Sequence, residues 1–476
     1  MKIRNKGQLL ESLLILLTFI LVFGLELHFK PANQDIWQHL KTGEYILKEK
    51  SIPRADIYSY TAFGNEWVTH EWLSQIIFYF FYFKFGMVSL IFLKAVIITL
   101  TFFILFKLID KNKNSNLYLS LILIVFAAFI TRYHSYTRPH IFSWLFIAVL
   151  LFLLQKKLYA YIPLLTLIWA NTHGSVLLGL AITAVYLGER IILKRQARLI
   201  YVLIISFLTP LANPSTYKVF LLPLQLLKFS AYIKEWKPFP ANSWWFIFYF
   251  MFVLITIISF IIAYKSERKL RIAELAIFLL FAYLGFSSKR SLAVSVIVIA
   301  PILANKLGML LKDRLKRNLL KDAVFSLVIA ALIVFSTTNL NAFNLKVSLE
   351  EYPANAVQFI KEKNITGNMY NDYGFGPFIL FSLYPDYKVF IDTRAEVYGE
   401  KMIKDYYYIR YALEHWEKLA ESYNISFFVI QHEPEIENAL YNSKNWKLVY
   451  YDNLASIYLK NTSRYERIQQ INLGKT

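Results

Sequence analysis

The chain has 476 residues, of which 57% are hydrophobic and only 18% are charged, and its mean hydropathy is +0.42. Soluble domains carry about 45–50% apolar and about 25% charged residues, so the composition excludes a soluble protein. Lysine and arginine outnumber the acids by 52 to 32, which gives a net charge of +20, and there is no cysteine. Disulfides, thiolate metal sites and cysteine nucleophiles are therefore excluded too.

The apolar residues gather in runs whose lengths approach the roughly 20 residues that a helix needs to cross a bilayer. The first run, residues 9–27, follows Lys2, Arg4 and Lys6. It is longer than a signal-peptide core and no small-residue cleavage site follows it, so we expect a retained helix. Further runs cover 87–106, 117–131, 141–154, 159–170, 175–192, 199–211, 244–264, 273–286, 292–304 and 323–340. We expect a polytopic α-helical membrane domain with about eleven transmembrane helices.

Basic residues mark alternate loops between these runs, and positive residues concentrate in cytoplasmic loops. The basic clusters are Lys107, Lys111 and Lys113; Lys156 and Lys157; Arg190, Lys194, Arg195 and Arg198; Lys265, Arg268, Lys269 and Arg271; and Lys306, Lys312, Arg314, Lys316, Arg317 and Lys321. With the N-terminus in the cytoplasm, every cluster lies inside. The positive charge is thus explained by topology, and no nucleic-acid partner is expected.

The same alternation places a long first loop, 29–72, on the outer side of a bacterial or archaeal plasma membrane. We expect the membrane domain over 1–340 and a soluble α/β domain on the extracytoplasmic face over 341–476. Alternating or continuous apolar residues predict its strands and intervening amphipathic patterns predict its helices. The strands are expected at 367–370, 387–392, 426–431, 446–450 and 455–459, and the helices at 353–363, 399–423 and 434–442. No nucleotide-binding glycine loop follows any strand.

The first outer loop is dense in acids, histidines and tryptophans. Asp35 and His39 stand four residues apart, so on a helix they share one face. The pair could hold a divalent metal such as Mg²⁺ or Mn²⁺, or Asp35 could act as a general base beside the imidazole. Asp56 follows Pro53 and belongs either to the catalytic group or to the start of a turn. Glu71 is a further candidate, as ligand or orienting group.

Three tryptophans of this loop, Trp37, Trp67 and Trp72, allow two interpretations. Aromatic residues gather at the membrane–water interface, and they also line binding sites. The sequence alone leaves both interpretations open.

Basic residues also occur at outer turns, where the positive-inside rule disfavours them. They are Arg138, His140, His173, Lys289 and Arg290. Ionisable groups at the ends of apolar spans often mark a polar cavity, and the guanidinium fork suits phosphate. We expect this group to bind a phosphate or diphosphate.

The segment Asp35-Ile-Trp37-Gln-His39-Leu-Lys41 is similar to the first-loop motif of oligosaccharyltransferase catalytic subunits. Together with the many helices and the trailing α/β domain, it resembles the GT-C class of membrane glycosyltransferases. The resemblance implies that Asp35 is catalytic and that the donor is a sugar on a polyprenyl phosphate or diphosphate. The pieces Trp169-Ala-Asn171-Thr-His173-Gly174 and Arg138-Pro139-His140 also resemble bacterial membrane proteins grouped with the glycosyltransferases.

A second similarity lies in the α/β region, at Tyr370-Asn371-Asp372-Tyr373-Gly374 and at Phe390-Ile391-Asp392. In oligosaccharyltransferases two tryptophans precede the equivalent Asp-Tyr-Gly, which reads the acceptor. Here Tyr370 and Asn371 replace the tryptophans. The resemblance implies that Asp372, Tyr373 and Asp392 lie on the acceptor side.

The sequence therefore predicts a membrane glycosyltransferase that moves a sugar from a polyprenyl-linked donor to a glycan, lipid or protein acceptor outside the cell. Two alternatives are a lipid or polysaccharide transporter (flippase) and a non-catalytic membrane scaffold. A transporter would carry ionisable residues near mid-membrane and often inverted repeats, whereas these residues gather at one face and no repeat is evident.

Overall fold

The computed structural model of the chain describes residues 2–28, 34–110, 116–229, 234–267, 271–311 and 318–471. It divides into two compact units. The membrane unit comprises Met1–Phe29, Phe85–Pro223 and Ser230–Lys346, and the α/β unit comprises Lys30–Lys84, Leu224–Phe229 and Val347–Thr476. Of the predicted basic loop residues, Lys111, Lys113, Arg268, Lys269, Lys312, Arg314, Lys316 and Arg317 lie outside the described residues.

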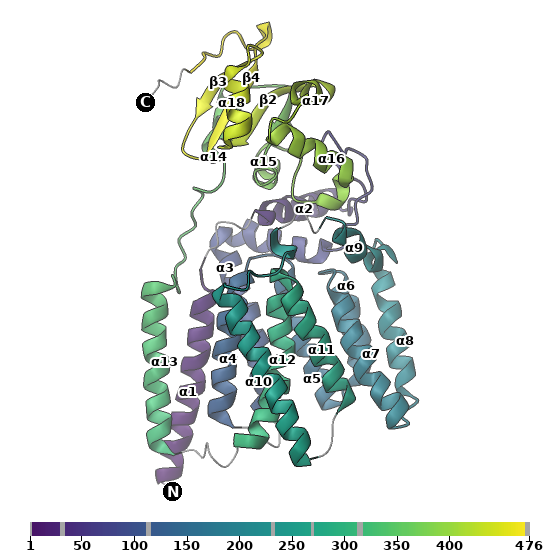
Figure 1. Cartoon of the computed structure of the whole chain (residues 1–476), viewed down its shortest axis with the longest axis vertical. Helices are drawn as coiled ribbons and strands as arrows, with labels where there is room; N and C mark the ends of the chain where they lie inside the picture. The colour runs from purple at the N-terminus through teal and green to yellow at the C-terminus, as the bar shows by residue number, and fades with distance from the viewer. Residues whose placement is uncertain are drawn as a thin grey trace. The chain divides into compact units, whose positions relative to one another are not determined.

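Long apolar helices build the membrane unit (Figure 1). They are α1 (Lys2–Glu26), α3 (Trp72–Asp110), α4 (Leu117–Thr131), α5 (His140–Lys156), α6 (Ile162–Ala170), α7 (Val176–Leu193), α8 (Leu199–Leu208), α9 (Lys218–Leu227), α10 (Trp244–Glu267), α11 (Ile272–Ser287), α12 (Leu292–Leu311) and α13 (Leu319–Asn339). The unit boundaries divide α3, whose helical backbone is interrupted at Gly86 (φ 73°), and α9, which contains Pro223.

Each of the eleven apolar runs expected from the sequence overlaps one of these helices. Within the described ranges, seven helices are long and apolar enough to cross a membrane, and the shorter apolar helices are His140–Lys156, Tyr159–Ala170, Leu199–Ala212 and Ile272–Ser287. The chain is an integral membrane protein.

Asparagine side chains cap the starts of two membrane helices. The side chain of Asn116 accepts a hydrogen bond from the amide of Leu119 at the start of α4, and Asn318 does the same for Lys321 at the start of α13. Asparagine is among the preferred N-cap residues because its side-chain oxygen satisfies an otherwise unpaired amide. The expected run at 117–131 coincides with α4.

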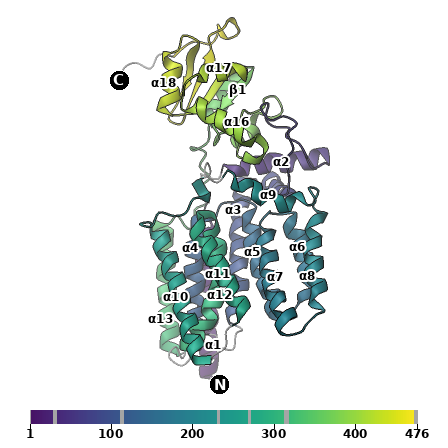
Figure 2. The same ribbon diagram turned by 45° about the vertical axis from the view of Figure 1, so that its right-hand side comes forward.

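The core of the membrane unit lies along α12, which neighbours α4, α5, α10 and α11; the helices run beside one another in both views (Figures 1 and 2). Ser295 of α12 lies 2.5 Å from the hydroxyl of Tyr249 in α10 and donates to the carbonyl of Phe281 in α11. The Tyr249 ring packs against Gly285, where an added Cβ would come within 2.2 Å of the hydroxyl. Small residues and satisfied polar groups are the usual means of close helix packing in membranes.

A four-stranded sheet organises the α/β unit. The strands are β1 (Asn368–Asn371), β2 (Ile425–Gln431), β3 (Trp446–Tyr451) and β4 (Ala455–Lys460), and the helices are α2 (Asp35–Glu49), α14 (Ala354–Glu362), α15 (Gly376–Leu383), α16 (Ala395–Arg410), α17 (Trp416–Ser422) and α18 (Pro434–Asn442). The strand order is β1-β2-β4-β3, with β1 parallel to β2 and the other pairs antiparallel. Four of the five expected strands are confirmed.

The expected strand at 387–392 is wrong, because other groups occupy its backbone. The amide of Phe390 donates to the side chain of Asn371, whose Nδ2 donates to the carbonyl of Ile391. Val389 instead pairs with the first-loop segment, since its amide donates to the carbonyl of Tyr58 and its carbonyl accepts from the amide of Tyr60. The expected single helix at 399–423 is also wrong, since α16 ends at Arg410 and Ala412 and His415 have positive φ.

The first loop belongs to the α/β unit rather than forming a separate connection. Its helix α2 packs against α15, and Trp37 contacts the rings of Tyr352, Phe378 and Phe381 with centroids 5.0–5.3 Å apart. Trp37 and Trp67 are each only 4% exposed. Both tryptophans are therefore core residues of this unit. Their burial favours neither a place at the membrane–water interface nor a place lining a binding site.

Close packing of α2 on the start of α3 predicts the effect of one substitution. A Cβ at Gly43 would lie 2.2 Å from the carbonyl oxygen of Gln75, so Gly43→Ala forces the two helix backbones apart and should destabilise the α/β unit by about 1–3 kcal/mol. Gly188→Ala is the control, because nothing lies within 4 Å of its added methyl. Thermal unfolding in detergent should show a lower midpoint for Gly43→Ala alone. An unchanged midpoint would contradict the packing described.

Candidate functional site

Asp35 is the first residue of α2 and lies beside the turn that follows β1. A Cβ added at Gly374 would lie 2.7 Å from the Nε2 of Gln34, so the start of α2 contacts that turn directly. Burial raises the pKa of the Tyr373 hydroxyl well above its ordinary value, and the carboxylates of Asp35 and Glu396 raise it further. The first-loop aspartate and the predicted acceptor-side tyrosine, far apart in sequence, are thus neighbours.

Glu71 lies between two histidines. Its Oε1 is 3.4 Å from the Nε2 of His70 and its Oε2 is 4.0 Å from the Nδ1 of His39. The same Nδ1 of His39 lies 3.3 Å from the amide nitrogen of Gln75. His39 is buried, so this imidazole is held in place by α3 as well as by its own helix.

Two ionisable residues that sequence reasoning missed complete the group, namely His70 and Glu396. Burial opposes protonation of His70, but the charge and hydrogen bond of Glu71 outweigh it and raise the pKa of the imidazole above its ordinary value. Burial raises the pKa of the Glu396 carboxyl, which His70 and Arg394 only partly offset. The sequence positions of these two residues could have indicated them, because His70 directly precedes Glu71 and Glu396 lies four residues after Asp392.

We call this set the acidic site. Its members, linked through the contacts and charge interactions above, are Asp35, His39, His70, Glu71, Tyr373 and Glu396. It combines carboxylates with imidazoles, the two side chains most used for proton transfer.

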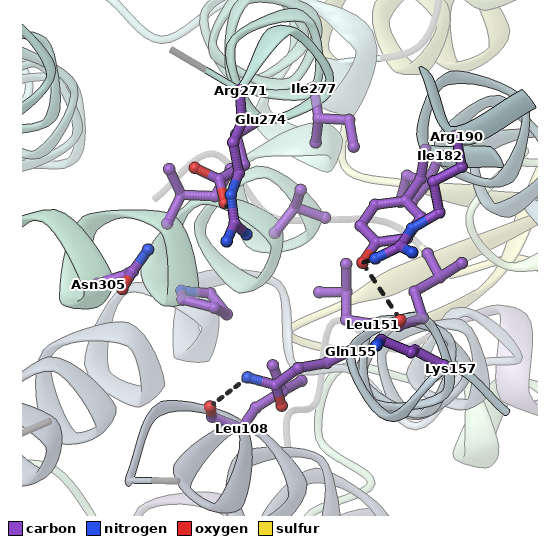
Figure 3. Close-up of a pocket in the computed structure, with 15 residues that line it drawn as sticks. Leu108, Leu151, Gln155, Lys157, Ile182, Arg190, Arg271, Glu274, Ile277 and Asn305 are labelled. Carbon is purple, nitrogen blue, oxygen red and sulfur yellow. Dashed lines mark hydrogen bonds and ion pairs between the residues drawn. The ribbon is translucent and has the colours of Figure 1, made fainter. Parts of the chain in front are cut away.

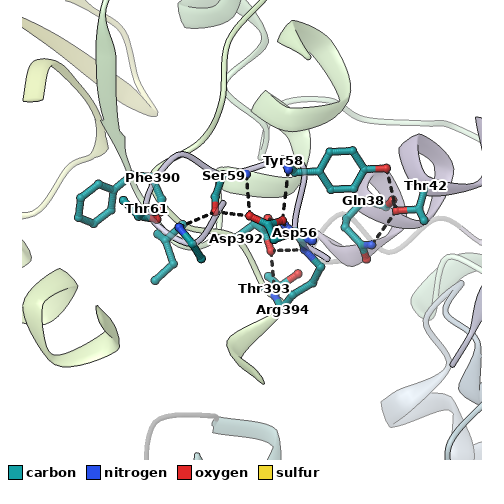
Figure 4. Close-up of polar contacts among 12 residues, drawn as sticks. Gln38, Thr42, Asp56, Tyr58, Ser59, Thr61, Phe390, Asp392, Thr393 and Arg394 are labelled. Atoms are coloured by element: carbon teal, nitrogen blue, oxygen red, sulfur yellow. Dashed lines mark hydrogen bonds and ion pairs between the residues drawn. The ribbon is translucent and has the colours of Figure 1, made fainter. Parts of the chain in front are cut away.

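Asp56 and Asp392 meet in a different arrangement, side by side at the Arg394 guanidinium (Figure 4). The Nη2 of Arg394 is 2.8 Å from Asp56 and 2.6 Å from Asp392, and its Nε donates to Asp392 at 2.9 Å. The guanidinium carbon also lies 4.4 Å from the centroid of the Trp67 ring and 5.0 Å from that of Tyr58. All three charged residues are buried.

The remaining bonds of Asp56 close a turn of the first loop. Its carboxylate accepts from the amide of Tyr58 at 3.2 Å and from the amide and hydroxyl of Ser59 at 3.0 and 2.5 Å. These are the contacts expected if Asp56 lies at the start of a turn. Together with the ion pair, they tie the first loop to the segment after Asp392.

Asp372 also lies in a buried network. Arg410 and the Tyr406 hydroxyl donate to its Oδ1, and the amide of Gln431 donates to its Oδ2. Burial raises the pKa of the Asp372 carboxyl, and Arg410 offsets part of that rise. Arg410 is held in turn by Glu433, 2.6 Å away. The three predicted acceptor-side residues thus differ: Tyr373 joins the acidic site, whereas Asp372 and Asp392 each pair with an arginine.

In the membrane unit, the basic residues of the predicted phosphate site gather at one set of helix ends. Arg290 precedes α12, and its Nη2 lies 3.4 Å from the Nε2 of His173, which precedes α7. The charges of Arg138 and Arg290 both act on the ring of His140 at the start of α5. Lys289, beside them in sequence, has its ammonium 5.8 Å from the ring of Phe239.

The two arginines differ in their pairing. Both carboxylate oxygens of Glu235 lie close to the Nη1 of Arg138, at 3.2 and 3.3 Å. Arg290 instead faces the ring of Trp236 at 5.5 Å, and no carboxylate of the described residues lies within ion-pair distance of it. Arg290 is therefore the stronger anion-binding candidate.

His173 is oriented by a hydroxyl network. Its Nδ1 lies 2.9 Å from the Oγ of Ser143 and 2.8 Å from that of Ser175, and Ser143 accepts a hydrogen bond from the Trp169 indole. This network directs the Nε2 of His173 towards Arg290.

The donor set does not fit the expected divalent metal. No group of three or more His, Asp or Glu side chains that could hold a metal ion occurs in the described part of the chain. His39 is also engaged by Gln75 and Glu71. We therefore derive no chemistry through a metal ion.

The Arg394 ion pairs predict a large loss of stability on substitution. Arg394→Gln leaves two buried carboxylates without their counter-charge, which should cost about 3–5 kcal/mol. Chemical denaturation in detergent, followed by tryptophan fluorescence, measures this because Trp67 stacks on the guanidinium. Lys404→Gln, which removes an exposed pair with Glu400, should change little. Equal stability of the two variants would show that the buried pairs do not hold the loop.

The raised pKa of His70 predicts a pH-dependent contribution to stability. A raised folded-state pKa stabilises the protein fully below the unfolded value of 6.5 and loses that effect as pH rises through the folded value. His70→Gln should therefore lower the unfolding midpoint more at about pH 6 than at about pH 9. The exposed His415 gives the control variant, His415→Gln. A pH-independent effect of His70→Gln would refute the Glu71 pairing.

Neither a protein-family model nor a curated relative matches the sequence. Among solved structures, the chain is similar to the archaeal oligosaccharyltransferase AglB from Archaeoglobus fulgidus in complex with an inhibitory peptide and a dolichol-phosphate. The TM-score is 0.62 at 11% identity, over 97% of this chain and 75% of that chain. The apo form of an Archaeoglobus fulgidus oligosaccharyltransferase gives 0.58 at 10% identity, over 95% and 74%. The chain thus has the fold of the archaeal oligosaccharyltransferases, as the resemblance implied.

Proposed function

We propose that this protein is a glycosyltransferase that moves a sugar from a polyprenyl phosphate or diphosphate donor to an acceptor outside the cell. The observation that carries the proposal is the fold likeness over 97% of the chain to a protein whose structure holds a dolichol-phosphate. It extends through the first loop, where the acidic site lies. The outer placement rests on the expected topology, in which eleven crossings that start inside would leave the basic loops in the cytoplasm.

In the α/β unit, Asp35 is proposed to accept the proton of the acceptor nucleophile. It stands at the N-terminus of α2, where the helix dipole favours a negative charge, and it is adjacent to Tyr373. Glu71, with His39 and His70, is proposed to orient polar groups around it. A positioned base of this kind contributes about 10²–10⁴-fold to the rate.

In the membrane unit, Arg290 is proposed to bind the phosphate of the lipid donor, with Arg138, Lys289, His140 and His173 around it. As the bond between the sugar and the phosphate oxygen breaks, negative charge develops on that oxygen. Cationic donors already in place stabilise this charge without reorganisation. Because Arg138 is partly neutralised by Glu235, the larger share of the stabilisation falls to Arg290.

The acceptor is proposed to be read differently from an oligosaccharyltransferase sequon. Tyr370 and Asn371, which stand where those enzymes carry two tryptophans, are both fully buried. The Tyr370 hydroxyl donates to the carbonyl of Tyr406, and Asn371 bonds the backbone of residues 390 and 391. Neither side chain is therefore available to a peptide. The proposed acceptor is a glycan, a lipid or a protein.

Asp35→Asn tests the proposed base, because the amide keeps the size of the side chain but cannot accept the proton. The rate of sugar transfer from a polyprenyl-linked donor, measured by mass spectrometry with the purified protein in lipid, should fall by about 10²–10⁴-fold. Asp386→Asn removes an exposed carboxylate of the same unit and should leave transfer unchanged. Full activity of Asp35→Asn would remove the residue from the mechanism.

A further inference from the structure

A cavity of about 330 Å³ opens between α5, α7, α11 and α12, and no part of the proposed transfer chemistry uses it (Figure 3). One part of its wall is apolar and includes Leu151, Leu154, Ile182, Ile277 and Val298. Two arginines enter it from different helices: Arg190 from α7 and Arg271 from the start of α11 (Figure 3). The cavity is thus amphipathic, with cations facing a hydrocarbon wall.

The cavity lies at the opposite helix ends from the arginine group described above. Helix α5 begins at His140 and ends at Lys156, and the cavity is lined by its last turn, including Gln155. Helix α11 runs from Ile272, next to Arg271, to Ser287, shortly before Arg290. The two places are therefore separated by the length of the same helices and are distinct sites.

The charges around the cavity favour an anion. The acid in its wall, Glu274, is already paired with Arg271 at 3.0 Å and with Lys306 at 3.1 Å. Arg190 contacts the Tyr186 hydroxyl at 3.3 Å and the rings of Tyr159 and Tyr186, and none of the described carboxylates lies within ion-pair distance of it. Lys157 adds a further cation at the rim.

We propose that this cavity binds the phosphate headgroup of an anionic membrane lipid. The guanidinium of Arg190 donates to the phosphate oxygens, which arginine binds in a fork geometry, and Arg271, which shares Glu274 with Lys306, adds a second cation. The apolar wall takes the first carbons of the acyl chains, which a free phosphate could not use. Basic pockets between transmembrane helices at the positively charged side of a protein are suited to anionic lipids of that leaflet. This proposal does not depend on the proposed transfer reaction.

Native mass spectrometry of the full-length protein tests the proposal. The protein, stripped of lipid, is exposed to equal amounts of phosphatidylglycerol and phosphatidylcholine. Phosphatidylglycerol should bind in preference, and Arg190→Gln should reduce that preference about tenfold, the order expected for one lost charge-assisted hydrogen bond. Arg271→Gln is the second variant, because this side chain is 69% exposed and its loss does not threaten folding.

Arg198→Gln is the matched control, since it removes an exposed arginine at the same helix ends, just before α8. It should keep the lipid preference of the wild type. The proposal is overturned if both cavity variants keep that preference, or if Arg198→Gln loses it equally. Inorganic phosphate is tested in parallel by thermal unfolding. Stabilisation by phosphate alone, equal to that by the lipid, would show that the ligand is a soluble anion rather than a lipid.

Discussion

The arrangement of the α/β unit depends on one buried charge, the guanidinium of Arg394. It lies between Asp56 of the first loop and Asp392, and both carboxylates need it because neither reaches solvent. A buried ion pair adds little net stability compared with an apolar core, but removing one partner is costly. Loss of Arg394 would therefore leave Asp56 of the first loop and Asp392 as buried carboxylates without a counter-charge. The acidic site is built on this junction.

The membrane helices could be predicted well, because their signals are local. The apolar length of a run is visible in the run itself, and the run expected at 117–131 coincides with α4. The strand expected at 387–392 failed for the opposite reason. Its backbone groups form hydrogen bonds with Asn371 and with residues 58 and 60. A local sequence pattern does not predict a partner more than 300 residues away.

The candidate site could be predicted only in part, for the same physical reason. Asp35, His39 and Glu71 were expected from their residue types and their place in the first loop, and Tyr373 from the resemblance; the structure brings them together. Asp56 and Asp392 have the same residue type as Asp35, yet they serve as partners of Arg394. Sequence alone does not separate a carboxylate that is neutralised in the core from one at a helix start, because the neutralising arginine is brought close only by folding.

The oligosaccharyltransferase-like fold, the acidic site and the arginine group support the proposed function, in which the protein consumes a lipid-linked sugar. The most direct test is to incubate the purified wild-type protein, in lipid, with a panel of polyprenyl phosphate- and diphosphate-linked sugars, and to measure release of the polyprenyl product by mass spectrometry. The account predicts release from at least one donor, dependent on added acceptor. If no donor released the polyprenyl product, with or without added acceptor, the account would be contradicted.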